Sequence, residues 1–116
     1  MIQPPTIIAK RTGPNRYELD LVIASDHVCF AGHFPGNPIL PGVVQVGWAV
    51  TCAEELHGFA AGVQKLERVK FIHPILPGMH ITLHLSVDSE SKRVRYEYRD
   101  ATTRYASGTL CFRVTP

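Results

Sequence analysis

Apolar and polar residues alternate in five stretches of the chain, and this period of two is typical of strands that bury one face. The first stretch runs from Arg16 to Ile23, and the other four lie after residue 68. Turn sequences rich in Asp, Ser and Thr separate the last three, which therefore predict an antiparallel meander. The apolar positions are Tyr17, Leu19, Leu21 and Ile23; Val69 and Phe71; Ile81, Leu83, Leu85 and Val87; Val94, Tyr96 and Tyr98; and Ala106, Gly108, Leu110, Phe112 and Val114.

Between the first and second stretches the pattern changes to one that is typical of a buried helix. From Gly42 to Ala53 apolar residues occupy nearly every side, and a polar face appears only at Glu54 to His57. This predicts a helix that is buried at its first turns, emerges at its end and stops at Gly58. The preceding segment, residues 31–42, is rich in Gly and Pro, which excludes a regular helix there.

One long apolar helix and about five mostly antiparallel strands predict an α+β fold in which the sheet wraps around the helix. The chain has 116 residues, 45% of them hydrophobic, which suits a single domain over residues 1–116. Because a domain of this size buries a limited share of its surface, we expect an oligomer, with strand edges that pair across a dimer.

Charge and composition narrow the function classes. The net charge of +2 is far from the excess that a nucleic-acid-binding protein carries, so we expect no nucleic-acid partner. The three cysteines form no CxxC pair and the histidines have no metal-binding spacing, so neither a metal site nor a redox motif is expected. The first residues lack the features of a signal peptide, and the apolar run from Val43 to Ala53 is shorter than the roughly 18 residues that span a bilayer. We therefore expect a cytoplasmic protein with no membrane span.

The segment Phe30-Ala31-Gly32-His33-Phe34-Pro35-Gly36-Asn37-Pro38-Ile39-Leu40-Pro41-Gly42-Val43 resembles the active-site signature of the β-hydroxyacyl-acyl-carrier-protein dehydratases. A later segment, residues 68–78, resembles the strand and turn that follow the central helix in that family. Within the family, the sequence from Val43 to Ala49 is most similar to the small dehydratases of aryl-polyene pigment pathways.

The resemblance implies a hotdog-fold dimer that removes water from a 3-hydroxyacyl thioester, carried on the phosphopantetheine of an acyl carrier protein, in fatty-acid or aryl-polyene type synthesis. It implies no cofactor. Such an elimination needs a base, an acid for the leaving hydroxyl and donors for the carbonyl oxygen. His33 is the expected base, and the backbone N–H of Gly42 at the helix start is the expected carbonyl donor. The residues expected along the substrate are Phe34, Pro35, Gly36, Pro41, Val43 and Gly47.

One position departs from the family's pattern, because the carboxylate that protonates the hydroxyl is replaced by Gly47. Glu54 lies roughly 10 Å farther along a helix, too far for a direct substitute, and Gln45 or a water would be a poor acid. A related partner chain in a heterodimer could supply the carboxylate instead. The alternatives are therefore an active dehydratase, a non-catalytic thioester-binding or partner subunit and, third, a hotdog thioesterase.

Overall fold

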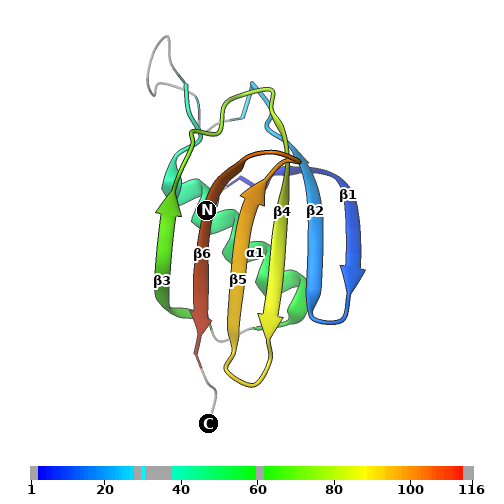
Figure 1. Cartoon of the computed structure of the whole chain (residues 1–116), viewed down its shortest axis with the longest axis vertical. Coiled ribbons are helices and arrows are strands. Elements are labelled where there is room, and N and C mark those ends of the chain that lie inside the picture. Colours follow the sequence, from blue (N-terminus) through cyan, green and yellow to red (C-terminus); the bar gives the residue numbers. More distant parts are fainter. Residues whose placement is uncertain (1–2, 28–29, 31–37, 60–61, 114–116) are drawn as a thin grey trace.

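The computed structural model describes residues 3–27, 30, 38–59 and 62–113, which contain one helix and six strands (Figure 1). In chain order the elements are β1 Thr6–Gly13, β2 Arg16–Val22, α1 Gly42–His57, β3 Val63–Phe71, β4 His80–Asp88, β5 Arg93–Arg99 and β6 Arg104–Phe112.

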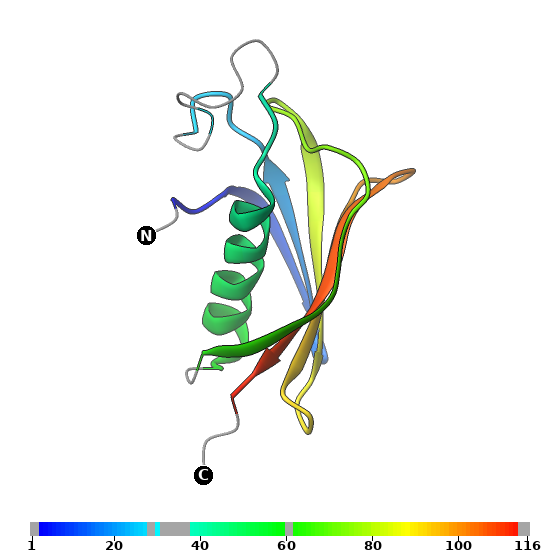
Figure 2. The same cartoon turned by 90° about the vertical axis from the view of Figure 1, so that its left-hand side faces the viewer.

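The six strands form one antiparallel sheet in the order β1-β2-β4-β5-β6-β3. Seen from the side, the sheet curves and α1 lies against its concave face (Figure 2). The predicted arrangement of a sheet wrapped around one helix is confirmed, as is the meander, because β4, β5 and β6 are neighbours in sequence order. The described part of the chain contains no helix with the length and apolar character needed to cross a bilayer.

The prediction of five strands was wrong because the first strand, β1, has no apolar alternation. All of its residues are exposed, and its two isoleucines, Ile7 and Ile8, are adjacent rather than alternate. The strand through Tyr17 is therefore the second. The strand predicted from Val69 and Phe71 also begins earlier, at Val63, and none of its residues is buried. Both misjudged strands are the edges of the sheet, where one side of the backbone lacks a neighbour and burial leaves little signature.

The core lies between α1 and the inward face of the sheet. Leu19 and Leu21 of β2 are buried as their alternation predicted, and so are the inward residues of β4 and β5. Trp48 of α1 is buried among them, and the Tyr98 hydroxyl donates a hydrogen bond of 2.5 Å to the backbone carbonyl of Gln45. Burial raises the pKa of Tyr98 well above its ordinary value, so this hydroxyl stays a donor at neutral pH.

The ends of α1 follow from its terminal residues. Gly58 adopts a left-handed conformation with φ 77°, and its N–H donates to the Glu54 carbonyl at 2.9 Å, which confirms the predicted stop. At the other end Pro41 is the N-cap residue, and no side chain caps the helix. The start of α1 therefore keeps backbone donors that no side chain of the described residues satisfies.

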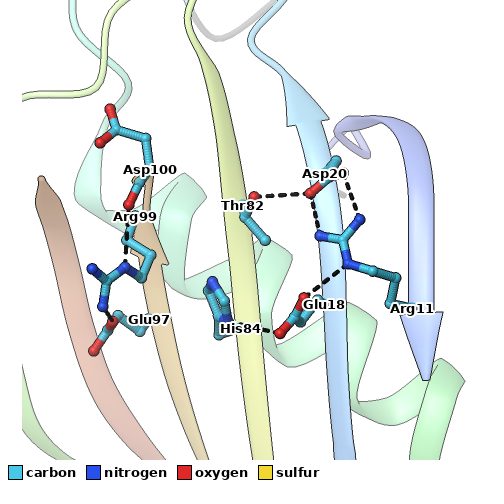
Figure 3. A network of polar contacts seen from close by, with 8 residues as sticks. All are labelled: Arg11, Glu18, Asp20, Thr82, His84, Glu97, Arg99 and Asp100. Atoms are coloured by element: carbon cyan, nitrogen blue, oxygen red, sulfur yellow. Dashed lines mark hydrogen bonds and ion pairs between the residues drawn. The ribbon is translucent and has the colours of Figure 1, made fainter. Parts of the chain in front are cut away.

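The outer face of the sheet, which faces away from α1, is polar. Arg11 of β1 donates to both carboxylate oxygens of Asp20 at 2.7 and 2.8 Å and to Glu18 at 2.8 Å. Thr82 of β4 also donates to Asp20, and His84 lies 3.6 Å from Glu18 (Figure 3). These contacts join three neighbouring strands through their side chains.

We predict that Gly108→Ala destabilises the protein by about 1–3 kcal/mol, as expected for an overpacked core. A Cβ at this position would lie 2.6 Å from Cε2 and 2.7 Å from the hydroxyl oxygen of Tyr96, whose side chain is fully buried. The control is Tyr96→Phe, because its hydroxyl has no partner among the described residues and its removal is expected to be neutral or stabilising. Urea denaturation measures both, and equal stability of Gly108→Ala and the parent would contradict this packing.

We predict that Asp20 stabilises the protein fully above about pH 4 and progressively less at lower pH. Hydrogen bonds from Arg11 and then Thr82 lower the pKa of Asp20 to about 2, so the contribution is lost as the pH falls towards that value. Asp20→Asn should lower the free energy of unfolding by about 0.2–1 kcal/mol at neutral pH, and the difference should shrink at acidic pH. Urea denaturation across this range tests it, with Asp26→Asn as an exposed control; a difference that does not change with pH would contradict it.

Candidate functional site

An open pocket of about 490 Å³ lies at the start of α1. One wall comes from the residues that lead into the helix and from its first turn, and the other from the end of β3 and the residues after it. The described residues that line it are mostly apolar and include no carboxylate. They are Ile39, Leu40, Pro41, Gly42, Gln45, Phe71, Ile72, His73 and Pro74.

Backbone and side-chain hydrogen bonds hold Leu40 at the base of this pocket. The Leu40 N–H donates to the Ile75 carbonyl at 2.8 Å, which joins the two segments that form the walls. The Leu40 carbonyl accepts a bond of 3.0 Å from Nε2 of Gln45. Gln45 is 4% exposed, and its Oε1 has no hydrogen-bond partner among the described residues. The buried Oε1 of Gln45 can thus accept a hydrogen bond from another donor.

The backbone donors at the start of α1 are also open. The Pro41 carbonyl accepts from the N–H groups of Val44 and Gln45 at 3.0 and 3.1 Å, whereas those of Gly42 and Val43 have no acceptor within the described residues. The first turn carries no acidic side chain. Unpaired N–H groups and the positive end of the helix dipole therefore meet at the pocket, an arrangement that stabilises a partial negative charge on an oxygen.

Packing against Phe71 explains why residue 42 is a glycine. A Cβ on this residue would lie 2.6 Å from Cζ of Phe71, so the aromatic ring rests directly on the glycine. Phe71 is 56% exposed despite its size, and it forms part of the pocket wall. The glycine thus allows β3 and the helix start to approach each other closely.

Only some of the expected site residues are described by the structure, and only some of these line the pocket. His33, Phe34, Pro35 and Gly36 lie outside the described residues, so their expected roles stay predictions. Pro41 and Gly42 line the pocket together. Val43 is 73% exposed, and neither it nor the half-buried Gly47 belongs to the pocket lining.

The residues on either side of the signature loop are anchored. Before it, the His27 ring is buried and lies 5.4 Å from the ring of Trp48, in an edge-to-face arrangement. Nε1 of Trp48 donates to the backbone carbonyl of Gln3 at 2.8 Å. Trp48 itself is buried against the sheet, as the prediction of a buried helix over this apolar run implies. The described residues before this segment and those after it, at Leu40, are therefore both held by contacts with the rest of the fold.

Among the described residues, the titratable groups near the helix offer no ready acid. Burial raises the pKa of Cys52 to about 11, so this thiol is neutral and a weak acid at neutral pH. Glu54 is half-buried on α1, about two turns beyond Gly47. Among the described residues no group of His, Cys, Asp or Glu could hold a metal ion.

Sequence reasoning missed the second wall of the pocket. Phe71, Ile72 and His73 approach the helix start because β3 ends beside it, and only the three-dimensional pairing of Leu40 with Ile75 reveals this. The available signal was the Pro-rich turn after Phe71, which the resemblance singled out as a family feature but which carries no indication of its neighbour.

Comparisons with known proteins agree on one family. The family model described as ApeI-like, ApeI dehydratase, matches residues 9–109. The 3-hydroxyacyl-(acyl-carrier-protein) dehydratase FabZ of Novosphingobium aromaticivorans is 29% identical over 96 residues, which cover 75% of this chain and 61% of the relative. FabZ of Caldanaerobacter subterraneus is 35% identical over 74 residues, or 58% of this chain and 52% of the relative. The chain thus spans less than two thirds of the length of these relatives.

Solved structures identify the fold as the hotdog fold. The dehydratase heterocomplex ApeI:P from Xenorhabdus doucetiae matches with a TM-score of 0.87 and 27% identity, covering 94% of this chain and 98% of that chain. The dehydratase domain of PpsC from Mycobacterium tuberculosis is 17% identical with a TM-score of 0.69, over 97% of this chain and 44% of that chain. The second likeness concerns the fold alone.

We predict that Gln45→Met lowers the free energy of unfolding by about 1–3 kcal/mol, because it leaves the Leu40 carbonyl without its donor. Methionine keeps the length of the side chain, so lost hydrogen bonding dominates over lost volume. Thr51→Ala, at an exposed position of the same helix, serves as the control. Thermal and urea unfolding measure the difference. A variant as stable as the parent would show that this bond does not hold the pocket.

Proposed function

Since the chain belongs to the ApeI-like dehydratase family, we propose that it eliminates water from a 3-hydroxyacyl thioester borne by an acyl carrier protein, in fatty-acid or aryl-polyene type synthesis. The observation that carries this proposal is the family match over residues 9–109, most of the chain. The apolar pocket at the uncapped start of α1 supports it, because an acyl thioester needs both an apolar surface and donors for its carbonyl.

In the proposed reaction His33 removes the proton α to the thioester carbonyl. Negative charge then develops on the carbonyl oxygen, and the N–H of Gly42 stabilises it. The electron pair left on the α-carbon forms the double bond as the bond from the β-carbon to the hydroxyl oxygen breaks. The hydroxyl leaves as water after it receives a proton from an acid. Pro41 and Gly42 line the pocket beside the proposed carbonyl position.

The acid of this reaction is proposed to come from a second chain. Gly47 has no acidic group, and no residue that lines the pocket at the helix start carries a carboxylate. The structurally similar ApeI:P protein is a dehydratase heterocomplex. A pairing of this chain with a different chain therefore has a precedent in a protein of the same shape. In such a pair, His33 of this chain would act with a carboxylate of the partner. The complementary site, which contains Gly47, would lack an acid.

The surface around the pocket suits a second hotdog chain. Large apolar side chains are exposed beside it, among them Val43 at the helix start and Phe71 and Ile72 at the end of β3. β3 is an edge of the sheet, so its outer backbone groups lack a strand neighbour among the described residues. Covering this edge would bury the apolar side chains and pair the backbone in one step.

A non-catalytic role is the second candidate, and Gly47 is the observation that favours it. In that case the chain binds the thioester or supports a partner, and only the partner performs the chemistry. The two candidates differ in what His33 does, because only in the first is its imidazole needed for turnover.

The test is a dehydration assay with a carrier-linked 3-hydroxyacyl thioester, on the purified chain alone and with a related chain that has a carboxylate at the position matching Gly47. We expect little turnover by the chain alone and at least about tenfold more turnover in the mixture. When the partner in the mixture lacks its own histidine, His33→Ala should lower the turnover about 10²-fold or more. Gly47→Asp should raise the turnover of the chain alone.

His57→Ala provides a matched control, since His57 lies at the far end of α1 and contacts Tyr17 and Ser89 instead of the pocket. Unchanged turnover after His33→Ala, in a mixture that contains no other catalytic histidine, would refute the assignment of the base. A folded Gly47→Asp variant that is as inactive as its parent would refute the simple loss of an acid.

A further inference from the structure

A small hollow of about 160 Å³ on the outer face of the sheet is surrounded by positive charge. It lies over β3, β5 and β6, on the side of the sheet away from α1, and is thus separate from the pocket at the helix start. Four basic side chains and no acidic one border it. Its lining residues are Arg68, Lys70, Arg95, Arg104, Ser107, Gly108 and Thr109.

A bulge in β3 creates part of this concentration of charge. Glu67 is paired with Thr109 and Lys70 with Ser107, so β3 has one more residue than β6 over the same interval. Arg68 adopts φ 53° within this interval, a left-handed conformation that is unfavourable for a residue with a Cβ. The extra residue places Lys70 instead of Val69 opposite Ser107, and both Arg68 and Lys70 border the hollow. Bulges of this kind redirect side chains, often next to functional sites.

The acidic residues nearby are already neutralised. Glu67 pairs with Lys65 at 3.2 Å and Arg93 at 3.0 Å. Glu97 pairs with Arg99 at 3.1 Å and with Arg104 at 3.2 Å; its contact with Arg99 is visible in Figure 3.

Three cations at the hollow lack such partners. Arg68, Lys70 and Arg95 form no ion pair with any described residue, although all three border the same hollow. Like charges that gather without counter-charges repel one another, and an anion that joins them relieves this repulsion.

Hydroxyl donors complete the hollow. Ser107 is 8% exposed, and its hydroxyl has no hydrogen-bond partner among the described residues. Thr109, two positions along β6, borders the same hollow. Both hydroxyls are free to donate to an oxyanion that enters the hollow.

We propose that this hollow binds a phosphate group. A phosphate oxyanion offers several acceptors in a small volume and matches both the guanidinium donors of Arg68 and Arg95 and the hydroxyl of Ser107. The hollow is too small to receive a protein helix, which is about 10 Å wide, so the site fits a small anion rather than an acidic protein surface. The site does not depend on the proposed dehydration, since it uses none of the residues assigned to that reaction.

The test follows the backbone amide NMR signals of Ser107, Gly108 and Thr109 while inorganic phosphate is added to the full chain at constant ionic strength, with chloride as the comparison salt. We expect saturable shifts at these residues with a millimolar Kd. Methyl phosphate and dimethyl phosphate then distinguish a terminal phosphate ester from a bridging diester as the natural source. Lys70→Gln and Arg95→Gln should each weaken binding about two- to fivefold, and the double variant should weaken it further.

Arg68→Gly separates binding from folding. It removes the cation while glycine adopts the positive φ without strain, so phosphate affinity should fall about two- to fivefold while the Tm stays equal or rises. Lys10→Gln, at the opposite edge of the sheet, removes the same charge and should leave affinity unchanged. Shifts that do not saturate, that chloride reproduces, or that keep the affinity of the parent in the Lys70→Gln and Arg95→Gln double variant would overturn the proposal. Binding of an acidic protein at this face without any binding of phosphate would overturn it as well.

Discussion

Burial of α1 against the concave face of the sheet is the constraint on which the rest of the structure depends. The helix is apolar around most of its circumference, so it is stable in water only when strands cover it. Trp48 and Ala49 face the inward residues of the sheet, and the Tyr98 hydroxyl fixes one backbone carbonyl of the helix. Because the helix is held along its length, its first turn has a defined position, and the open N–H groups there meet the end of β3.

The amount of the fold that could be predicted follows the amount of apolar burial. Strands with one face against α1, such as β2 with Leu19 and Leu21, show a clear period of two, and Gly58 marks the end of the helix by its chemistry. β1 was missed because it is exposed on both faces and its place depends on hydrogen bonds to β2, which any sequence can form. The bulge at Arg68 was also unpredictable, since it depends on the register with β6.

Part of the candidate site could likewise be predicted from the sequence, and part could not. The signature residues were found through a resemblance, and Pro41 and Gly42 do meet at one pocket. Sequence could not indicate that Phe71 rests on Gly42 or that Gln45 holds Leu40, because those contacts join segments whose proximity arises only on folding. Gln45 illustrates this limit. The sequence shows a polar side chain in an apolar helix, but only the structure shows that its Nε2 donates to a backbone carbonyl while its Oε1 has no partner among the described residues.

The bulge in β3 also has a consequence for assembly. An edge strand with regular spacing accepts almost any extended chain, because backbone hydrogen bonds do not depend on side-chain identity. Near Arg68 this edge is irregular, and its unpaired N–H and C=O groups no longer repeat at even intervals. A strand added at this edge can form hydrogen bonds with all of these groups only if its own backbone has a matching bulge opposite Arg68. The edge therefore selects its neighbour by backbone shape, which disfavours indiscriminate aggregation and allows two similar chains to be told apart.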